Sequence, residues 1–212
     1  MRLTILGASG RVGQEVLKQA IAAGHDVVVL VRDPSRLDVE TGVTVITGTV
    51  NDPEAVDRAV NGADAVISAI GPDANELDQV ERLRDGMRQT IRAMRHHGVR
   101  RIVNLSGAGI TAPGERKPLF DRLATRVVRL FSGHVVAAKQ AEYDELAGSD
   151  LEWIAVRPGI VTDGEASGRY HAGPNELRPG ARVSRGDIGH LMLAEAQRPS
   201  HIGHPGIFVR AS

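Results

Sequence analysis

The sequence predicts an α/β protein with a doubly wound parallel sheet, and two observations support this fold class. Short apolar runs rich in valine and isoleucine, which are typical of buried parallel strands, alternate with stretches of helical periodicity. Three glycines follow the first apolar run directly, where a strand turns into a helix. Parallel strands joined by helices bring their carboxyl ends to one edge of the sheet, so we expect the ligand site there.

The elements follow in chain order. The predicted strands are Leu3–Leu6, Val27–Val31, Val43–Ile46, Ala65–Ile70, Ile102–Leu105, Leu151–Val156 and Ile207–Val209. The predicted helices are Val12–Ala22, Pro53–Val60, Val80–His97, Leu119–Phe131, Val135–Ala147 and Ile188–Ala196. In the long third helix, apolar residues recur every three to four positions, and Gly98 supplies a left-handed C-cap.

Two longer irregular stretches, Gly107–Pro118 and Gly159–Val183, follow strands at the expected ligand edge. Long loops in compact domains are more often functional than accidental. We predict that the second stretch is a small C-terminal region that covers the substrate, and that Tyr170 within it contacts the acceptor. The whole chain, residues 1–212, is predicted to form one domain.

Composition excludes several classes of protein. The chain has 26 basic and 26 acidic residues, so net charge gives no reason to expect a nucleic acid or an anionic membrane as partner. The absence of cysteine excludes disulfides, thiolate catalysis and cysteine-ligated metals. His96 and His97 lack an accompanying carboxylate pattern, so we predict no metal. Without a signal peptide or a long apolar segment, a cytoplasmic protein is expected, as a monomer or small homo-oligomer.

The most informative motif is the glycine pattern Gly7, Gly10 and Gly13. A dinucleotide pyrophosphate needs a tight turn, close approach of the backbone, and a helix N-terminus whose N–H groups face the phosphate charge. Glycine meets these steric demands. An ordinary glycine turn is the alternative, but the position after the first strand of an alternating α/β chain favours a dinucleotide cradle.

The end of the second strand indicates which dinucleotide is bound. An acidic residue there holds the ribose 2′-hydroxyl of NAD, whereas arginine accommodates the 2′-phosphate of NADP. Arg32 occupies this position and Arg36 lies near it. Asp33 is the complication, because it can bond a hydroxyl or hold an arginine, and a solvated basic loop is the alternative. We favour NADP.

These residues carry a family resemblance. The chain resembles the atypical short-chain dehydrogenase/reductases of the NAD(P)H-binding, NmrA-like group, and is most similar to its flavin reductase/biliverdin-IXβ reductase branch. The matching segments, which span almost the whole chain, are 7–13, 31–37, 63–67, 97–106, 153–158, 162–170 and 183–189.

The resemblance implies a set of cofactor contacts. It puts the pyrophosphate on the glycine turn, the 2′-phosphate on the two arginines, the adenine near Val50 and Asp52, and the nicotinamide along the end of the fourth strand. The implied cofactor-binding residues are Gly7, Ser9, Gly10, Arg11, Val12, Gly13, Arg32, Arg36, Val50, Asp52, Ala69, Ile70, Gly71, Ser106 and Pro158. Thr49 replaces an acidic residue common in relatives, and Asp52 before Pro53 is equally typical of a helix N-cap.

The catalytic group is less clearly marked. The Tyr-x-x-x-Lys pair of typical short-chain dehydrogenases is missing, since Val135 precedes Lys139 by four residues and Tyr143 follows it. Tyr143 is expected to pack against the sheet. The candidates are Lys139, Ser106 at the end of the fifth strand, and His134, with turn capping and a helix-start position as the alternatives for the last two.

The sequence therefore predicts an NADPH-dependent reductase that transfers a hydride to a small conjugated acceptor, flavin- or quinone-like. Solvent can supply the proton in such a reduction, so the missing tyrosine does not exclude it. The alternative is an NADP-sensing regulatory protein, similar to NmrA, that binds the cofactor without turnover.

Overall fold

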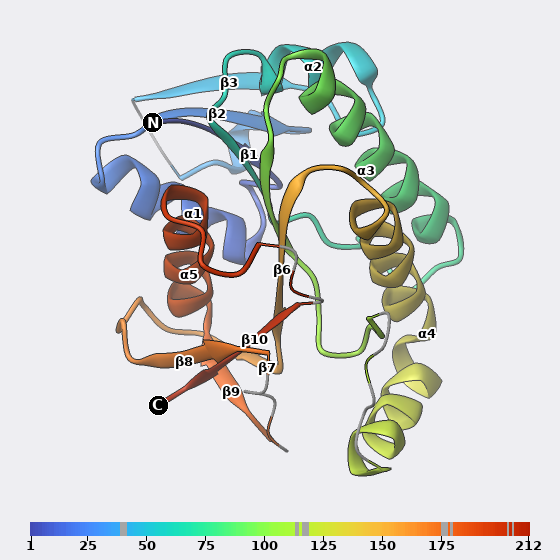
Figure 1. Ribbon diagram of the computed structural model, residues 1–212. Coiled ribbons are helices and arrows are strands. Elements are labelled where there is room, and N and C mark those ends of the chain that lie inside the picture. Colours follow the sequence, from blue (N-terminus) through green and yellow to red (C-terminus); the bar gives the residue numbers. More distant parts are fainter. Residues whose placement is uncertain are drawn as a thin grey trace.

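An open, twisted sheet with helices on both faces forms the core of the chain (Figure 1). The computed structural model describes residues 1–38, 42–112, 115, 119–174, 178, 180–202, 204 and 206–212, and residues 119–132 as helix backbone. The large sheet has the order β3-β2-β1-β4-β5-β6-β10-β8, in which only β8 runs antiparallel to its neighbour. A second small sheet pairs β7 with β9.

The strands are β1 (Arg2–Leu6), β2 (Asp26–Val31), β3 (Val43–Thr47), β4 (Ala65–Ser68), β5 (Arg101–Leu105), β6 (Glu152–Pro158), β7 (Ile160–Thr162), β8 (Tyr170–Gly173), β9 (Arg182–Ser184) and β10 (Ile207–Ala211). The helices are α1 (Arg11–Ala22), the 3₁₀ turn η1 (Pro34–Arg36), α2 (Pro53–Val60), α3 (Asp78–His96), α4 (Leu119–Ala147) and α5 (Arg185–Gln197). The doubly wound α/β fold predicted from the sequence is confirmed.

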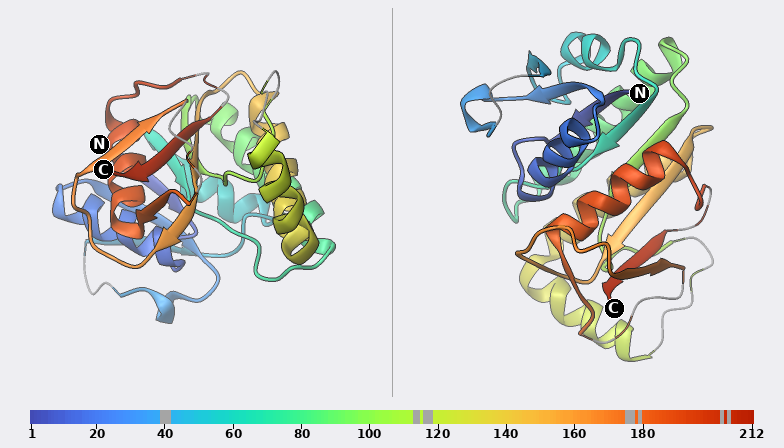
Figure 2. Two further views of the ribbon diagram at one scale, coloured as in Figure 1. Left: turned by 90° about the horizontal axis from the view of Figure 1, so that it is seen from below. Right: turned by 90° about the vertical axis from the view of Figure 1, so that its left-hand side faces the viewer.

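Alternation along each strand divides the core into two layers. In β2, Val27 and Val29 pack beneath α1 and α5, whereas Val28 and Leu30 pack beneath α2 and α3. Figure 2 shows α1 and α5 side by side on one face of the sheet, with α4 apart from them. Because successive side chains of a strand point to opposite faces, the almost uninterrupted apolar sequence of β2 is what two covered faces require.

The structure corrects three predicted elements. The helices predicted at Leu119–Phe131 and Val135–Ala147 form one helix, α4, because the intervening serine and glycine adopt helical backbone at a modest cost. The predicted strand Ala65–Ile70 ends at Ser68, where the chain leaves the sheet. The stretch Gly159–Val183 contains β7, β8 and part of β9, since its backbone groups find partners in neighbouring strands. Four residues of this stretch, and several of Gly107–Pro118, lie outside the described residues.

Gly13→Ala tests the contact between α1 and β1. A Cβ atom at Gly13 would lie 2.1 Å from the carbonyl oxygen of Gly7, and backbone cannot yield without moving the helix. We expect the free energy of unfolding to fall by about 3 kcal/mol or more, as measured by urea denaturation. Gly133→Ala is the matched control, because it lies in α4 with open space around it and should gain about 1 kcal/mol. An unchanged stability of Gly13→Ala would contradict the close contact.

Candidate functional site

The glycine turn joins β1 to α1 through close backbone contacts. Gly7 has a φ of 80°, and its carbonyl oxygen accepts a hydrogen bond of 3.0 Å from the Gly10 amide. A Cβ at Gly7 would lie 2.9 Å from the amide nitrogen of Ile70, so the turn also abuts the segment after β4. Gly10 is the N-cap of α1 and makes no side-chain cap. The first amides of α1 are thus available to an anion, as a phosphate cradle requires.

A pocket of about 540 Å³ opens in front of this turn, at the carboxyl ends of the central strands. Its lining residues are Gly7, Ser9, Gly10, Arg11, Val12, Leu30, Val31, Arg32, Arg36, Gly48, Thr49, Val50, Ala69, Ile70, Gly71, Pro72, Asp73, Arg82, Leu105, Val161 and Arg185. Five of them are arginines and one is an aspartate, which favours a ligand with several negative charges. The pocket unites most of the predicted cofactor residues.

An ion network covers the end of β2. Two nitrogens of Arg32 bond the Asp73 carboxylate at 2.7 and 2.9 Å, and Arg82 of α3 bonds the same carboxylate. The Arg32 guanidinium, followed by Arg82, lowers the pKa of Asp73. Because Asp73 is the counter-ion of both arginines, a phosphate that enters here must compete with it. Sequence reasoning missed Asp73 and Arg82, since neither lies in the glycine turn or at the strand end.

Asp33 has a different role from the one considered in the sequence. Its carboxylate accepts bonds from the amide and hydroxyl of Ser35 at 3.0 and 2.7 Å, and so caps the short turn η1. These bonds lower the pKa of Asp33. Asp33 does not line the pocket. The charged residues of this segment that do line it are Arg32 and Arg36.

In the segment that follows β3, Val50 lines the pocket but Asp52 does not. The Asp52 carboxylate accepts bonds from the amides of Glu54 and Ala55 at 3.1 and 3.2 Å, so it is the N-cap of α2. Of the two interpretations left open by the sequence, the structure shows the helix cap. Thr49, in place of an acidic residue, lines the pocket beside Val50.

Lys139 lies outside the pocket lining and bonds the backbone of two residues that line it. Its ammonium donates to the carbonyl oxygens of Ile70 and of Leu105, the latter at 2.7 Å, and to the Glu142 carboxylate at 2.8 Å. Both carbonyls belong to residues that line the pocket. Lys139 therefore binds two pocket segments, after β4 and at the end of β5, to α4.

Glu142 is the buried partner of this lysine and is 3% exposed. Burial raises the pKa of its carboxyl group, while Lys139 and the neighbouring Asn104 amide oppose that change. The pair lies one turn apart on α4. The sequence predicts no role for Glu142.

Three further predicted site residues lie apart from the pocket lining: Ser106 and His134, predicted as catalytic, and Pro158, predicted as a cofactor contact. Ser106 is buried, and its hydroxyl has no hydrogen-bond partner among the described residues. His134 is exposed on α4, where Asn75 accepts a bond of 3.0 Å from its amide. Pro158 ends β6, and its carbonyl accepts from Ala108 at 3.2 Å. These three stay predictions as site residues.

The two tyrosines occupy other environments. Tyr143 is 1% exposed and packs edge-on against Trp153, and burial raises the pKa of its phenol. It therefore packs against the sheet, as expected. Tyr170 donates or accepts a 2.8 Å bond with His190 and does not line the pocket, so its predicted contact with the acceptor is not supported. Among the described residues of 159–183, Val161 of β7 borders the pocket.

The profile of the NAD(P)H-binding family matches residues 7–199. The chain belongs to this NAD(P)H-binding family. Its pocket, with the glycine turn and the arginines, fits the nicotinamide dinucleotide that the family binds. Within the described residues, no helix combines the length and the apolar character that crossing a membrane demands.

Several relatives are similar in sequence, and one of them that is matched over most of this chain is named a reductase. The 3-diazoavenalumate denitrifying reductase of a Streptomyces species is 31% identical over 92% of this chain and 65% of its own length. The uncharacterized protein YwnB of Bacillus subtilis is 28% identical over 95% of this chain and 94% of its own. Other curated relatives are matched over only 33% and 36% of their length.

Among solved structures, the anaerobillin reductase ChuY from Escherichia coli O157:H7 superposes with a TM-score of 0.81. The superposition covers 100% of this chain and 97% of ChuY, at 22% sequence identity. The arrangement of strands and helices is therefore shared over the whole chain. The family model supports binding of a nicotinamide cofactor, and one of the relatives similar to this chain is named a reductase.

Lys139→Met tests the buried pair. Methionine keeps much of the apolar stem but leaves the Glu142 carboxyl without a cation, and breaking a buried pair costs about 3–5 kcal/mol. Because the pKa of the Glu142 carboxyl is raised in the folded protein, its protonated form contributes stability at low pH. That stability is lost as the pH rises through the folded-state pKa. We therefore expect the loss of unfolding free energy to be larger at neutral than at mildly acidic pH, as measured by urea denaturation at both.

Two companion variants make this measurement specific. Lys139→Met combined with Glu142→Gln should recover stability and lose the added pH dependence, because no carboxyl is left to titrate. Lys18→Met, at an exposed lysine, should change little. An equal deficit of Lys139→Met at both pH values would contradict the role given to Glu142.

Proposed function

We propose that this protein binds NADPH in the pocket at the carboxyl ends of β1, β2 and β4, and transfers a hydride to a small conjugated acceptor of flavin or quinone type. The observation that carries the proposal is the distribution of charge in the pocket. A bare glycine turn lies at the start of α1, and Arg32, Arg36 and Arg82 gather beyond the end of β2. These two regions match the pyrophosphate and the 2′-phosphate of one dinucleotide.

Binding of the phosphates rests on amides and guanidinium groups. Residues Ser9 to Val12 would hold the pyrophosphate, through the first amides of α1 and with the Arg11 side chain beside them. A 2′-phosphate would draw Arg32 away from Asp73, since a dianion with three oxygens offers more acceptors than one carboxylate. Arg36, on the turn that Asp33 caps, would approach from the same side.

The reactive end of the pocket is formed by backbone rather than by acid or base side chains. When bound, the nicotinamide supplies a hydride, and Ala69, Ile70 and Gly71 form the wall along which it would lie. Lys139 fixes that wall through the Ile70 carbonyl and is thus a positioning residue. A conjugated acceptor needs only a hydride at one atom, with a solvent proton completing the reduction, so the scarcity of acid groups in this wall favours flavins and quinones over simple carbonyl compounds.

The decisive experiment measures oxidation of NADPH in the presence of flavins, quinones and simple carbonyl compounds. We expect turnover with at least one flavin or quinone and none with the carbonyls. NADPH binding without any turnover would overturn the reductase proposal in favour of an NADP-sensing regulator. Turnover only with carbonyls would contradict the acceptor class but leave the cofactor proposal intact.

Arg32→Ala tests cofactor choice. If Arg32 holds the 2′-phosphate, wild-type protein should bind NADPH more tightly than NADH, and the variant should lose most of this preference. A charge-assisted hydrogen bond of this kind contributes about 1.5–3 kcal/mol, so we expect NADPH affinity to fall by more than about tenfold, with NADH affinity nearly unchanged. Isothermal titration of each nucleotide measures both values.

Asp73→Asn should change NADPH affinity in the opposite direction to Arg32→Ala. Removing the competing carboxylate frees Arg32 and Arg82, and an exposed pair of this kind contributes about 0.2–1 kcal/mol. NADPH affinity should therefore rise by up to about fivefold, whereas Asp85→Asn, which alters an exposed pair elsewhere on α3, should leave it unchanged. Equal affinities of the wild-type protein for NADPH and NADH would refute the assignment of Arg32.

A further inference from the structure

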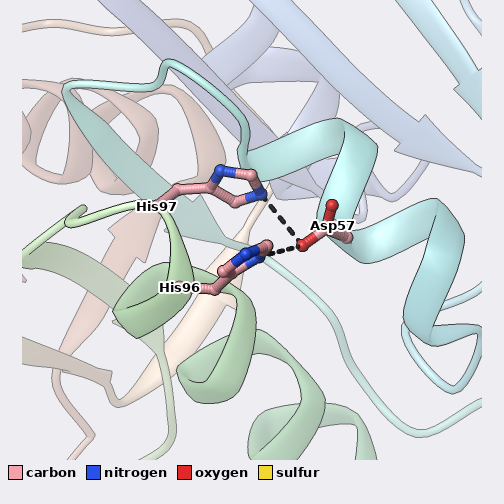
Figure 3. Close-up of side chains that lie close together, drawn as sticks. All are labelled: Asp57, His96 and His97. Carbon is pink, nitrogen blue, oxygen red and sulfur yellow. Dashed lines mark hydrogen bonds and ion pairs between the residues drawn. The ribbon is translucent and has the colours of Figure 1, made fainter.

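Three metal-ligating side chains converge on the outer helices. His96 ends α3 and His97 follows it, and both rings face Asp57 of α2 (Figure 3). The Nδ1 atom of His96 and the Nε2 atom of His97 each lie 2.9 Å from the same carboxylate oxygen of Asp57. The sequence predicted no metal because no carboxylate accompanies the two histidines along the chain, and the fold supplies one from 39 residues away.

We propose that Asp57, His96 and His97 form a binding site for a zinc-class divalent transition metal ion. Two imidazole nitrogens and one carboxylate oxygen are the ligands that Zn²⁺, Co²⁺ and Ni²⁺ accept, whereas Mg²⁺ and Ca²⁺ prefer oxygen alone. Three protein ligands leave at least one coordination position for water.

The geometry requires only a small adjustment. The three ligand atoms lie within 4.8 Å of one another. Zinc bonds of about 2.0–2.2 Å in tetrahedral directions separate ligand atoms by about 3.4 Å, so the carboxylate has to withdraw by about half an ångström from its hydrogen-bonded position. The Asp57 side chain is 42% exposed, so it has room to withdraw.

The electrostatics of this cluster suit a cation. His96 and His97 lie at the C-terminus of α3, where the helix dipole places partial negative charge. Glu54, Arg58 and Arg92 line the adjoining cleft, so the surrounding charge is mixed and the three ligand atoms themselves have to provide the affinity.

The location indicates a role separate from the cofactor. Arg82 of the pocket precedes His96 by 14 residues on α3, which is about 20 Å of helix. Bound metal would connect α2 to α3 across their contact and stabilise the folded chain by mass action. The site is thus structural or regulatory, and it is independent of the proposed reductase function.

Zinc binding to the tag-free protein tests the proposal. Isothermal titration with ZnCl₂ should give one ion per chain, and Co²⁺ should develop visible absorption bands from nitrogen and oxygen ligands. Loss of an outer-shell partner commonly weakens metal binding by about 10–100-fold, so loss of a direct ligand in Asp57→Asn should weaken it by at least about 100-fold. The double variant His96→Gln with His97→Gln should abolish it.

His171→Gln is the matched control, because it removes an exposed histidine outside the cluster. Zinc should raise the melting temperature of wild-type and control protein, and should not raise that of the cluster variants, whose folding is checked by circular dichroism. The absence of stoichiometric zinc binding would overturn the proposal, as would binding that survives in the folded double variant. In the first case the three residues form only a hydrogen-bonded contact between helices.

Discussion

The distance between α1 and β1 is the constraint on which the ligand site depends. At Gly13, only a hydrogen atom fits against the carbonyl group of Gly7. Gly7, which follows β1, also lies against the backbone of the segment after β4. This double contact fixes the start of α1, and with it the direction of the first helical amides. It also fixes how far the backbone from Ala69 to Gly71 can lie from the glycine turn. The glycine turn and the backbone from Ala69 to Gly71 line two parts of the pocket. Their relative positions therefore depend on these close backbone contacts and not on separate loops.

Charge is distributed unevenly across this pocket. At the β2 side, exposed ion pairs around Asp73 can exchange one anion for another at little cost, because water already screens them. At the β4 and β5 side, a buried ammonium holds two backbone carbonyls and a buried carboxylate, and any rearrangement would expose unpaired charge. The adaptable wall is suited to selecting a cofactor, and the rigid wall to orienting it.

The sequence predicted those parts of the molecule that depend on local pattern. The buried strands, the glycine turn and the arginine at the end of β2 were all visible, because period, steric demand and position along the chain determine them. The continuity of α4 was not visible, since the serine and glycine within it are compatible with either a break or a helix. Contacts between distant segments, such as Asp73 with Arg82, Lys139 with Ile70 and Asp57 with the histidines, depend on tertiary packing, which no local pattern encodes.

Two of the residues that attach the segment between β4 and α3 to the rest of the chain, Asp73 and Asn75, lie only two positions apart. Asp73 holds Arg32 over the pocket, and the Asn75 side chain accepts hydrogen bonds from the amides of His134 and Val135 at 3.0 and 3.2 Å. Arg82 of α3 still pairs with Asp73 when a ligand takes Arg32, so the release of Arg32 does not free the segment. Asp73 and Asn75 thus hold the backbone beside the pocket to α3 and to the middle of α4, independently of which anion occupies the end of β2.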